Sequence, residues 1–565
     1  MPVQRKPAKK VAAKKAASKK GPASKAASSK RSASKTNPPD NTKAGAPETT
    51  DWSRRVAKLG KRGAGPVDSI RVRMYRAGTG DCFFLQYRSK GDVTMNMLID
   101  CGCIQGGRAD MIPWLEDLWQ ETSGTIDVLV VTHQHADHIN GFQFCREEFD
   151  RFRFQRVWFA WTEDEEDAFA NELREHHSAI NLALQEAGQR FQQLTQNNYF
   201  ETQFQGVYNG RYLAKSKRRF MQAFEDINSL NLPVSTETKG NVPSMVQLFR
   251  NFNVIKNDTL VEFFSPGDLV KNLPGAEGIR FFILGPPRDT ELLSETEGGE
   301  ENFEKREEKS TRDFAFSLAL TGSKTDPERL PFEHLYEWVV TPPQASRNVT
   351  GLAAATGKTP SSLKEEYQKK PWQQIDHDWL LSAGSMALRY EGSINNTSLA
   401  MAIQFEESER VLLFPGDAEW GNWKSWHEGL TWRIRSGGST KTVNAEYLLN
   451  NTVFYKIGHH FSQNGSATRL GVEMMIHEDM AAMAPLNFTK IHTGWLNTMP
   501  NDLLGATLLA KAKGKLFFSG DCQKIFENIK TDRVHIKKAY ETEMVALNRV
   551  FDGKCFIDYV VEGSA

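Results

Sequence analysis

The sequence predicts an α/β protein that carries a helical insertion and a disordered basic tail. Residues 1–50 contain no Leu, Ile or Phe, so this segment cannot bury enough apolar surface to offset the entropy of ordering the chain. From about residue 67 onward, short apolar runs with strand periodicity alternate with segments of helical spacing. Between residues 162 and 232 the apolar residues recur at helical spacing. The 565 residues are 39% hydrophobic, which is enough for a large core.

Charge is divided unevenly along the chain. Residues 1–62 hold 18 Lys and Arg against 3 Asp and Glu, whereas the other 503 residues hold 53 basic and 67 acidic side chains. A flexible polycation of this kind binds the phosphates of nucleic acid by counterion release, so we expect nucleic acid as a partner. The alternative is a tail that solubilises the protein or folds back on its acidic body. The lysines expected to contact nucleic acid include Lys9, Lys10, Lys14, Lys15, Lys19 and Lys20.

Several classes of protein are excluded by the sequence. No run approaches the roughly 18 apolar residues of a membrane-spanning helix, so we expect no membrane partner. No apolar segment follows the basic start, which argues against a secretory signal. The six cysteines are scattered and form no CxxC pair, which indicates a reducing compartment. We therefore expect a cytoplasmic protein, with a nucleoid-associated or nuclear location left open by the tail.

The secondary structure expected in the body follows from these periodicities. Alternating or continuous apolar runs predict strands at 69–75, 82–87, 95–100, 126–131, 259–264, 280–284, 398–405, 410–414 and 452–457. A helix is expected over 109–120, and Thr162 with Glu165 predicts a capping box at the start of the helical insertion. Trp420, Trp423 and Trp426 are spaced by three residues, which favours a helix packed on a sheet over a base-stacking platform.

The expected organisation has six parts. They are a tail at 1–66, the first half of the α/β domain at 67–161, a mainly helical insertion at 162–255, a return to the sheets at 256–288, an acidic loop and linker at 289–390, and the second half with a C-terminal extension at 391–565.

Polar residues that can bind metal follow the predicted strand at 126–131. His133, His135, Asp137 and His138 lie within six residues of one another. A tight loop after a strand lets alternate side chains project in two directions, with the first two histidines toward one point and Asp137 with His138 toward another. Neutral imidazoles and an ionised carboxylate suit two divalent cations about 3.5–4 Å apart. The loop therefore predicts a metal centre.

Further ligands are expected from other strand ends at the same edge of the sheets. Asp417 follows an apolar strand and a Gly turn, and a carboxylate there could bridge two metals. His459 and His460 follow another such strand, and we expect one of them to be a ligand. Lys456 either meets a phosphate oxygen of the substrate or forms a buried ion pair. His177 follows Leu173 by four residues, so a packed helix histidine is favoured over a ligand.

These segments resemble a known family. The segment 132–138, Thr-His-Gln-His-Ala-Asp-His, is similar to the HxHxDH signature of the metallo-β-lactamase superfamily. Six further segments are similar to the hydrolase domain of ComEC-type DNA-uptake competence proteins, which narrows the resemblance to that branch. They are 80–85, 98–102, 284–287, 395–398, 413–418 and 456–460.

The resemblance implies a four-layer αββα sandwich with two divalent ions, Zn²⁺ with Mn²⁺ as an alternative, at one edge of the sheets. It assigns His133 and His135 to one metal, Asp137, His138 and His459 to the other, and Asp417 to a bridge. His460 is the alternate to His459, and Asp100 orients a ligand from outside. The chain departs from the family twice: 284–286 offers no third histidine, and Phe461 stands where Gly is usual. The first departure predicts that the first site binds its metal weakly or relies on water as a ligand. The second predicts a narrowed entrance to the metal centre or a displaced Ser462.

The chemistry expected of such a centre is hydrolysis by a hydroxide held between two metals, with Asp137 steering it. The first hypothesis is a phosphodiesterase or nuclease acting on nucleic acid or nucleotides. The second is a metallohydrolase of a small ester, amide, thioester or phosphorylated metabolite, with the tail only localising it, and the acidic body favours this one. A catalytically silent adaptor tethered to nucleic acid and a redox di-iron enzyme have less support.

Overall fold

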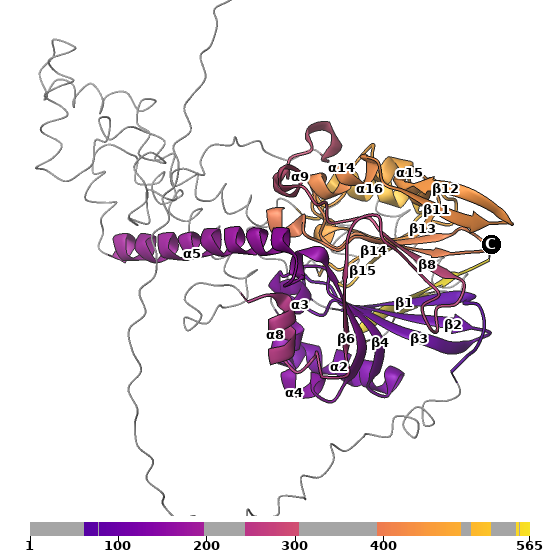
Figure 1. The fold of residues 1–565 in the computed structure, drawn as a ribbon, viewed down its shortest axis with the longest axis horizontal. Helices are drawn as coiled ribbons and strands as arrows, with labels where there is room; N and C mark the ends of the chain where they lie inside the picture. The colour runs from indigo at the N-terminus through magenta and orange to yellow at the C-terminus, as the bar shows by residue number, and fades with distance from the viewer. Residues whose placement is uncertain are drawn as a thin grey trace, which may run out of the picture. The chain divides into compact units, whose positions relative to one another are not determined.

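The computed structural model describes residues 62–76, 78–104, 106–196, 243–303, 392–487, 499–520, 550–552 and 554–564. The basic tail up to residue 61, the later part of the expected helical insertion and most of the linker insertion therefore lie outside the described residues. The described parts hold two large sheets and a two-stranded ribbon, β11 (Thr431–Ser436) with β12 (Ser439–Asn444) (Figure 1).

The first sheet has eight strands in the order β16-β17-β1-β2-β3-β4-β5-β6. The strands from β16 to β3 pair antiparallel, whereas β3, β4, β5 and β6 run parallel. The C-terminal strand β17 pairs with β1, so the two ends of the body meet in one sheet. The bounds are β1 Ser69–Tyr75, β2 Phe83–Ser89, β3 Asp92–Ile99, β4 Thr125–Val130, β5 Arg153–Ala160, β6 Leu260–Phe264, β16 Val550–Asp552 and β17 Phe556–Glu562.

The second sheet has seven strands in the order β15-β14-β13-β10-β9-β8-β7. The strands β15, β14, β13 and β10 run parallel, and the strands from β10 to β7 pair antiparallel. The bounds are β7 Leu269–Lys271, β8 Ile279–Ile283, β9 Met401–Phe405, β10 Val411–Phe414, β13 Thr452–Lys456, β14 Ala481–Ala484 and β15 Leu516–Phe518.

Three groups of buried apolar side chains join these elements. One group contains residues of both sheets, among them Phe83, Phe281 and Phe454. A second joins the first sheet to α2 (Arg108–Thr122), α3 (Ala136–Phe144), α4 (Arg146–Phe149) and α8 (Met245–Asn251). The third joins the second sheet to α14 (Trp420–His427), α15 (Ala445–Asn450) and α16 (Asp502–Lys511) (Figure 1). The predicted mixed α/β class is confirmed, and Trp423 and Trp426 pack on the sheet as expected.

The helical insertion begins later than the sequence predicted. Thr162 lies in a 3-10 turn, η1 (Trp161–Glu163), and Glu165 accepts a hydrogen bond from Ser244 Oγ at 2.7 Å. The predicted capping box is therefore wrong, because Thr162 does not begin an α-helix and the Glu165 side chain bonds Ser244 instead of a helix N-terminus. The long helix α5 (Ala168–Gln196) begins after Asp167, whose Oδ1 accepts from the backbone N–H of Phe169 and Ala170.

The described part of the acidic loop contains α9 (Thr290–Ser294) and the 3-10 turn η3 (Gly299–Glu301). Leu293 of α9 packs with Trp161 and with the first turns of α5. Two further 3-10 turns, η8 (His459–Phe461) and η9 (Val472–Met474), follow β13. In the described part of the chain, no helix combines the length and the apolar character needed to cross a lipid bilayer.

Candidate metal centre

The histidine-rich loop connects a buried strand to a helix. All six residues of β4 are buried, and α3 begins at Ala136 with His135 at its N-cap position. Glycine lets this helix start approach the neighbouring turn, because a Cβ on Gly102 would lie 2.4 Å from the carbonyl carbon of Asp137. Cys101 donates its backbone N–H to the His138 carbonyl at 2.7 Å. The turn after β3 therefore fixes the first turn of α3.

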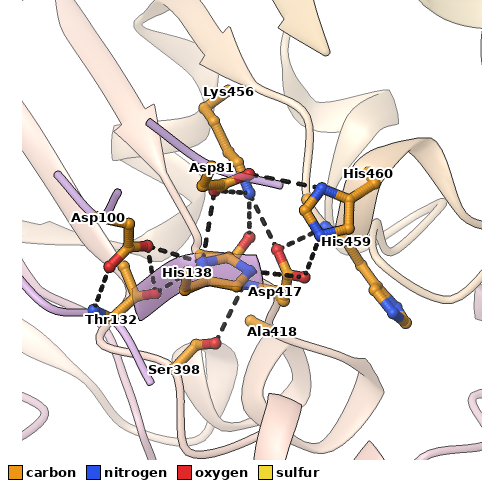
Figure 2. Close-up of polar contacts among 12 residues, drawn as sticks. Asp81, Asp100, Thr132, His138, Ser398, Asp417, Ala418, Lys456, His459 and His460 are labelled. Atoms are coloured by element: carbon orange, nitrogen blue, oxygen red, sulfur yellow. Dashed lines mark hydrogen bonds and ion pairs between the residues drawn. The ribbon is translucent and has the colours of Figure 1, made fainter. Parts of the chain in front are cut away.

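Four side chains that follow three strands converge here, and Figure 2 shows three of them, His138, Asp417 and His460. His460 Nε2 lies 2.8 Å from Asp137 Oδ2 and 3.1 Å from Asp417 Oδ2. His138 Nε2 also lies 3.1 Å from Asp417 Oδ2. Ligands of a tetrahedral metal with bonds of about 2.0–2.1 Å lie roughly 3.3 Å from one another. These three contacts among Asp137, His138, Asp417 and His460, here named the ligand group, therefore have the length expected between ligands of one divalent cation.

The other two histidines of the loop lie next to the ligand group. His133 Nε2 is 3.0 Å from His135 Nδ1, and the His133 ring centroid is 4.2 Å from that of His138. His133 Nδ1 faces Ser398 Oγ at 3.3 Å. The two side chains thus lie together, and their joint binding of a first metal stays a prediction.

Buried polar atoms without a hydrogen-bond partner also point to a cation. Among the described residues, Asp137 Oδ1 of the ligand group is such an atom. Buried polar groups in proteins are nearly always paired, so an unpaired one requires an explanation. Imidazole nitrogens and carboxylate oxygens are ligands of zinc and related ions, so the residues present fit the metals that the sequence implied.

Asp81 lies beside the ligand group, and it was not among the expected site residues. One ligand atom each from Asp81, His138, Asp417 and His460 lie within 4.8 Å of one another. Phe83, the first residue of β2, pairs with Ile99, the last residue of β3, so the turn before β2 lies beside Asp100. The antiparallel pairing of these two strands, had it been drawn from the sequence, would have placed Asp81 at the site.

The structure places His460, the alternate, in the ligand group and the preferred His459 outside it. Both have positive φ, 43° for His459 and 47° for His460, so the chain turns sharply and their side chains diverge. In Figure 2 the His459 ring points away from Asp417. Its side chain is 22% exposed, and its Nε2 lies 3.4 Å from Asn395 Nδ2.

Asp100 lies behind the histidines, where the resemblance put it. Its Oδ2 is 2.7 Å from His138 Nδ1, and its Oδ1 accepts from the backbone N–H of Thr132 at 2.8 Å. Lys456 is 1% exposed, and its Nζ contacts Asp417 Oδ1 at 3.0 Å. For Lys456 the structure therefore shows the buried ion pair, and places the ammonium away from solvent.

Electrostatics divide the histidines into two kinds. Burial alone would lower the pKa of His138 and His460, but nearby carboxylates, Asp417 first, outweigh it. The pKa of His138 is raised well above its usual value, and that of His460 to about 10. Burial lowers the pKa of His133 well below its usual value and that of His135 to about 4. His133 and His135 are therefore neutral and ready to bind metal, and the ligand group attracts positive charge.

The two positions at which the sequence departs from the motifs it resembles have structural counterparts. Phe461 is fully buried and its ring lies 5.6 Å from that of Phe518, so it faces the core and does not narrow the mouth. Ser462 Oγ donates to Asn464 Oδ1 at 2.8 Å. The segment 284–287 follows β8 and supplies no histidine, but its Pro286 carbonyl accepts from Trp161 Nε1 at 2.9 Å. His177 is buried on α5, where burial lowers its pKa to about 3.

The geometry defines a candidate metal centre of histidines and aspartates at strand ends of an α/β protein. Residues 75–150 of the chain match the model of the metallo-beta-lactamase superfamily. The matched stretch runs from the last residue of β1 past the end of α4, so it contains the histidine-rich loop. No curated protein matches the chain.

Proposed function

We propose that this protein is a metal-dependent hydrolase with the αββα architecture of the metallo-β-lactamase superfamily, and that it cleaves phosphodiester bonds in nucleic acid or nucleotides. The observation that carries the hydrolase assignment is the convergence of His138 Nε2 and His460 Nε2 on Asp417 Oδ2, within a chain similar to that superfamily. Two sheets with helices on their outer faces agree with the architecture.

The residues of the centre have distinct roles in this proposal. His133 and His135 would hold one ion, and Asp137, His138 and His460 the other, with Asp417 between them. When bound, such ions polarise the scissile bond and lower the pKa of water. Asp137 Oδ1 is buried without a hydrogen-bond partner, so it is available to orient the attacking water.

Nucleic acid as substrate is supported by the sequence. Residues 1–62 hold 18 basic and 3 acidic side chains, and the ordered motifs resemble a DNA-uptake hydrolase domain. The competing proposal is a small ester, amide, thioester or phosphorylated metabolite. It is favoured by the acidic body, whose 67 acidic against 53 basic side chains repel a polyanion.

The test offers metal-loaded protein a bis-aryl phosphodiester, single- and double-stranded DNA, and ester and lactam reporters. Cleavage of the phosphodiester and DNA, lost in an Asp137→Ala/His138→Ala variant, supports the first proposal. A His477→Ala variant is the matched control: His477 precedes β14, which runs parallel to β13, whereas His460 follows β13, so the two histidines lie at opposite ends of these strands. Turnover of only the ester or lactam would reject phosphodiester cleavage in favour of the second proposal.

The tail is tested separately with a chain that lacks residues 1–61. Arg62 is kept because its Nη1 pairs with Asp127 Oδ1 at 2.6 Å. If the tail binds nucleic acid, the shortened chain binds DNA more weakly and with a smaller salt dependence. Unchanged DNA affinity at low salt would eliminate this role.

A further inference from the structure

Lys456 and Asp81 are buried behind the ligand group and contact it without facing solvent. Lys456 Nζ lies 2.5 Å from Asp81 Oδ2 and 3.0 Å from Asp417 Oδ1, and it donates to the Gly416 carbonyl at 2.8 Å (Figure 2). An ammonium group has three N–H donors, and here each has an acceptor within the protein. Lys456 therefore acts on its neighbours in the site.

The first effect of Lys456 is on the orientation of Asp417. Asp417 Oδ1 receives both the Lys456 ammonium and the backbone N–H of His459, the latter at 3.2 Å. The other oxygen, Oδ2, is left facing His138 Nε2 and His460 Nε2. Because two donors hold one oxygen, rotation of the carboxylate is opposed and a single oxygen is presented to the ligand group.

The second effect is on His460, through Asp81. Asp81 Oδ1 lies 3.5 Å from His460 Nδ1, and among the described residues neither atom has a hydrogen-bond partner. His138 has a carboxylate on the same side of its ring but closer, with Asp100 Oδ2 2.7 Å from its Nδ1 and its Nε2 toward Asp417. Outer carboxylates of this kind orient histidine ligands of metals. Asp81 is close enough to count as a ligand. Its Oδ2 is held by Lys456 and its Oδ1 faces Nδ1 of His460, the ring nitrogen away from Asp417, which favours the outer position.

We propose that Asp81 and Lys456 form a positioning pair, in which Lys456 fixes the oxygen that Asp417 presents and anchors Asp81, and Asp81 in turn orients His460. Each histidine of the ligand group then has a carboxylate facing its outer nitrogen, at 2.7 Å for His138 and at 3.5 Å for His460. This inference rests on metal binding by the ligand group, as in the proposed function, and is independent of the substrate.

The test uses Co²⁺, whose visible absorption reports ligand geometry, with the full chain and its Asp81→Asn, Lys456→Met and double variants. Removing an outer partner of a metal ligand typically lowers metal affinity about 10–100-fold. We expect each single variant to lose that much Co²⁺ affinity and to change the spectrum. Since the two residues act as a unit, the double variant should lose no more Co²⁺ affinity than the single variant that binds Co²⁺ more weakly.

The matched control is Lys515→Met. Lys515 is also buried, and its Nζ pairs with Asp479 Oδ1 at 2.9 Å, so this change removes a buried ion pair before β15. It should leave the Co²⁺ affinity and spectrum unchanged, which separates positioning from a general loss of stability. Asp81→Asn preserves side-chain shape, so it tests the proposal even if Lys456→Met does not fold.

Three results would overturn the positioning pair. The first is Asp81→Asn with wild-type or tighter Co²⁺ affinity and an unaltered spectrum. The second is a double variant whose loss of binding free energy for Co²⁺ equals the sum of the losses in the two single variants. The third is a Lys515→Met control that changes the spectrum as much as Asp81→Asn does. A wild-type chain that binds no Co²⁺ would reject the metal centre and this inference together. Normal Co²⁺ binding without phosphodiester cleavage would reject only the proposed substrate.

Discussion

The two neighbouring histidines after β13 provide the sharpest test of the metal centre. His460 is buried and contacts Asp137 and Asp417 at 2.8 and 3.1 Å, whereas His459 is 22% exposed and lies 3.5 Å from Glu419. Replacing each by alanine removes the same atoms at adjacent positions. We expect His460→Ala to abolish tight metal binding and His459→Ala to preserve it.

The magnitudes follow from these contacts. Loss of an outer partner already lowers metal affinity about 10–100-fold, so loss of a ligand should cost at least about 100-fold. In metal-free protein, removing one partner of a buried ion pair costs about 3–5 kcal/mol. His460→Ala should therefore lower the free energy of unfolding by about that amount. For His459→Ala the cost should be about 1 kcal/mol or less, since its polar contacts are long.

The stability effect has a predicted pH dependence. Carboxylates outweigh burial and raise the pKa of His460 to about 10 in the folded, metal-free protein, above the usual 6.5. Its stabilising contribution is therefore complete below about pH 6.5 and is lost as the pH rises through about 10. The difference in unfolding free energy between wild type and His460→Ala should shrink over that range.

The assays are isothermal titration with Zn²⁺ and denaturant unfolding in the presence of a chelator, at several pH values. Comparable losses of metal affinity in both variants would contradict the reasoning, and so would a larger loss for His459→Ala. Comparable losses would mean that both imidazoles bind the metal, and a larger loss for His459→Ala would mean that the turn at η8 presents His459 when metal binds.

Two further predictions concern the same site. Gly102→Ala should prevent metal binding, since its Cβ would lie 2.4 Å from the carbonyl carbon of Asp137, whereas Gly107→Ala meets nothing within 4 Å and should bind normally. Equal metal content of the two purified variants would refute the close approach. Metal affinity should also rise with pH by about tenfold per unit for each proton displaced from His138 and His460, whose pKa values are raised. Calorimetry in buffers of different ionisation enthalpy measures that proton release, and a value of zero at pH 7 would contradict it.

Local periodicity was sufficient for much of the body. The run at 69–75 alternates polar and apolar residues and forms β1 over the same residues, and the runs at 126–131 and 452–457 match β4 and β13 to within one residue. The histidine-rich loop was recognisable because three histidines and an aspartate in six residues seldom serve packing alone. Helix starts were less predictable, because they depend on contacts with distant residues. The Glu165 carboxylate accepts a hydrogen bond from Ser244, about 80 residues further along the chain, and does not cap a helix at Thr162.

The sequence by itself determined the mixed α/β class and indicated most of the side chains that lie together at the candidate metal centre, because strand periodicity and ligand spacing are local properties. Only the tertiary structure decided which atoms meet. Two residues with positive φ turn His460 inward and His459 outward, and the pairing of β2 with β3 brings Asp81 beside Asp100. Lys456 could be assigned to an internal ion pair only when Asp81 and Asp417, 336 residues apart in the chain, were seen to share its ammonium. Contacts between such remote segments depend on strand order and backbone handedness, which the spacing of residues along the chain does not encode.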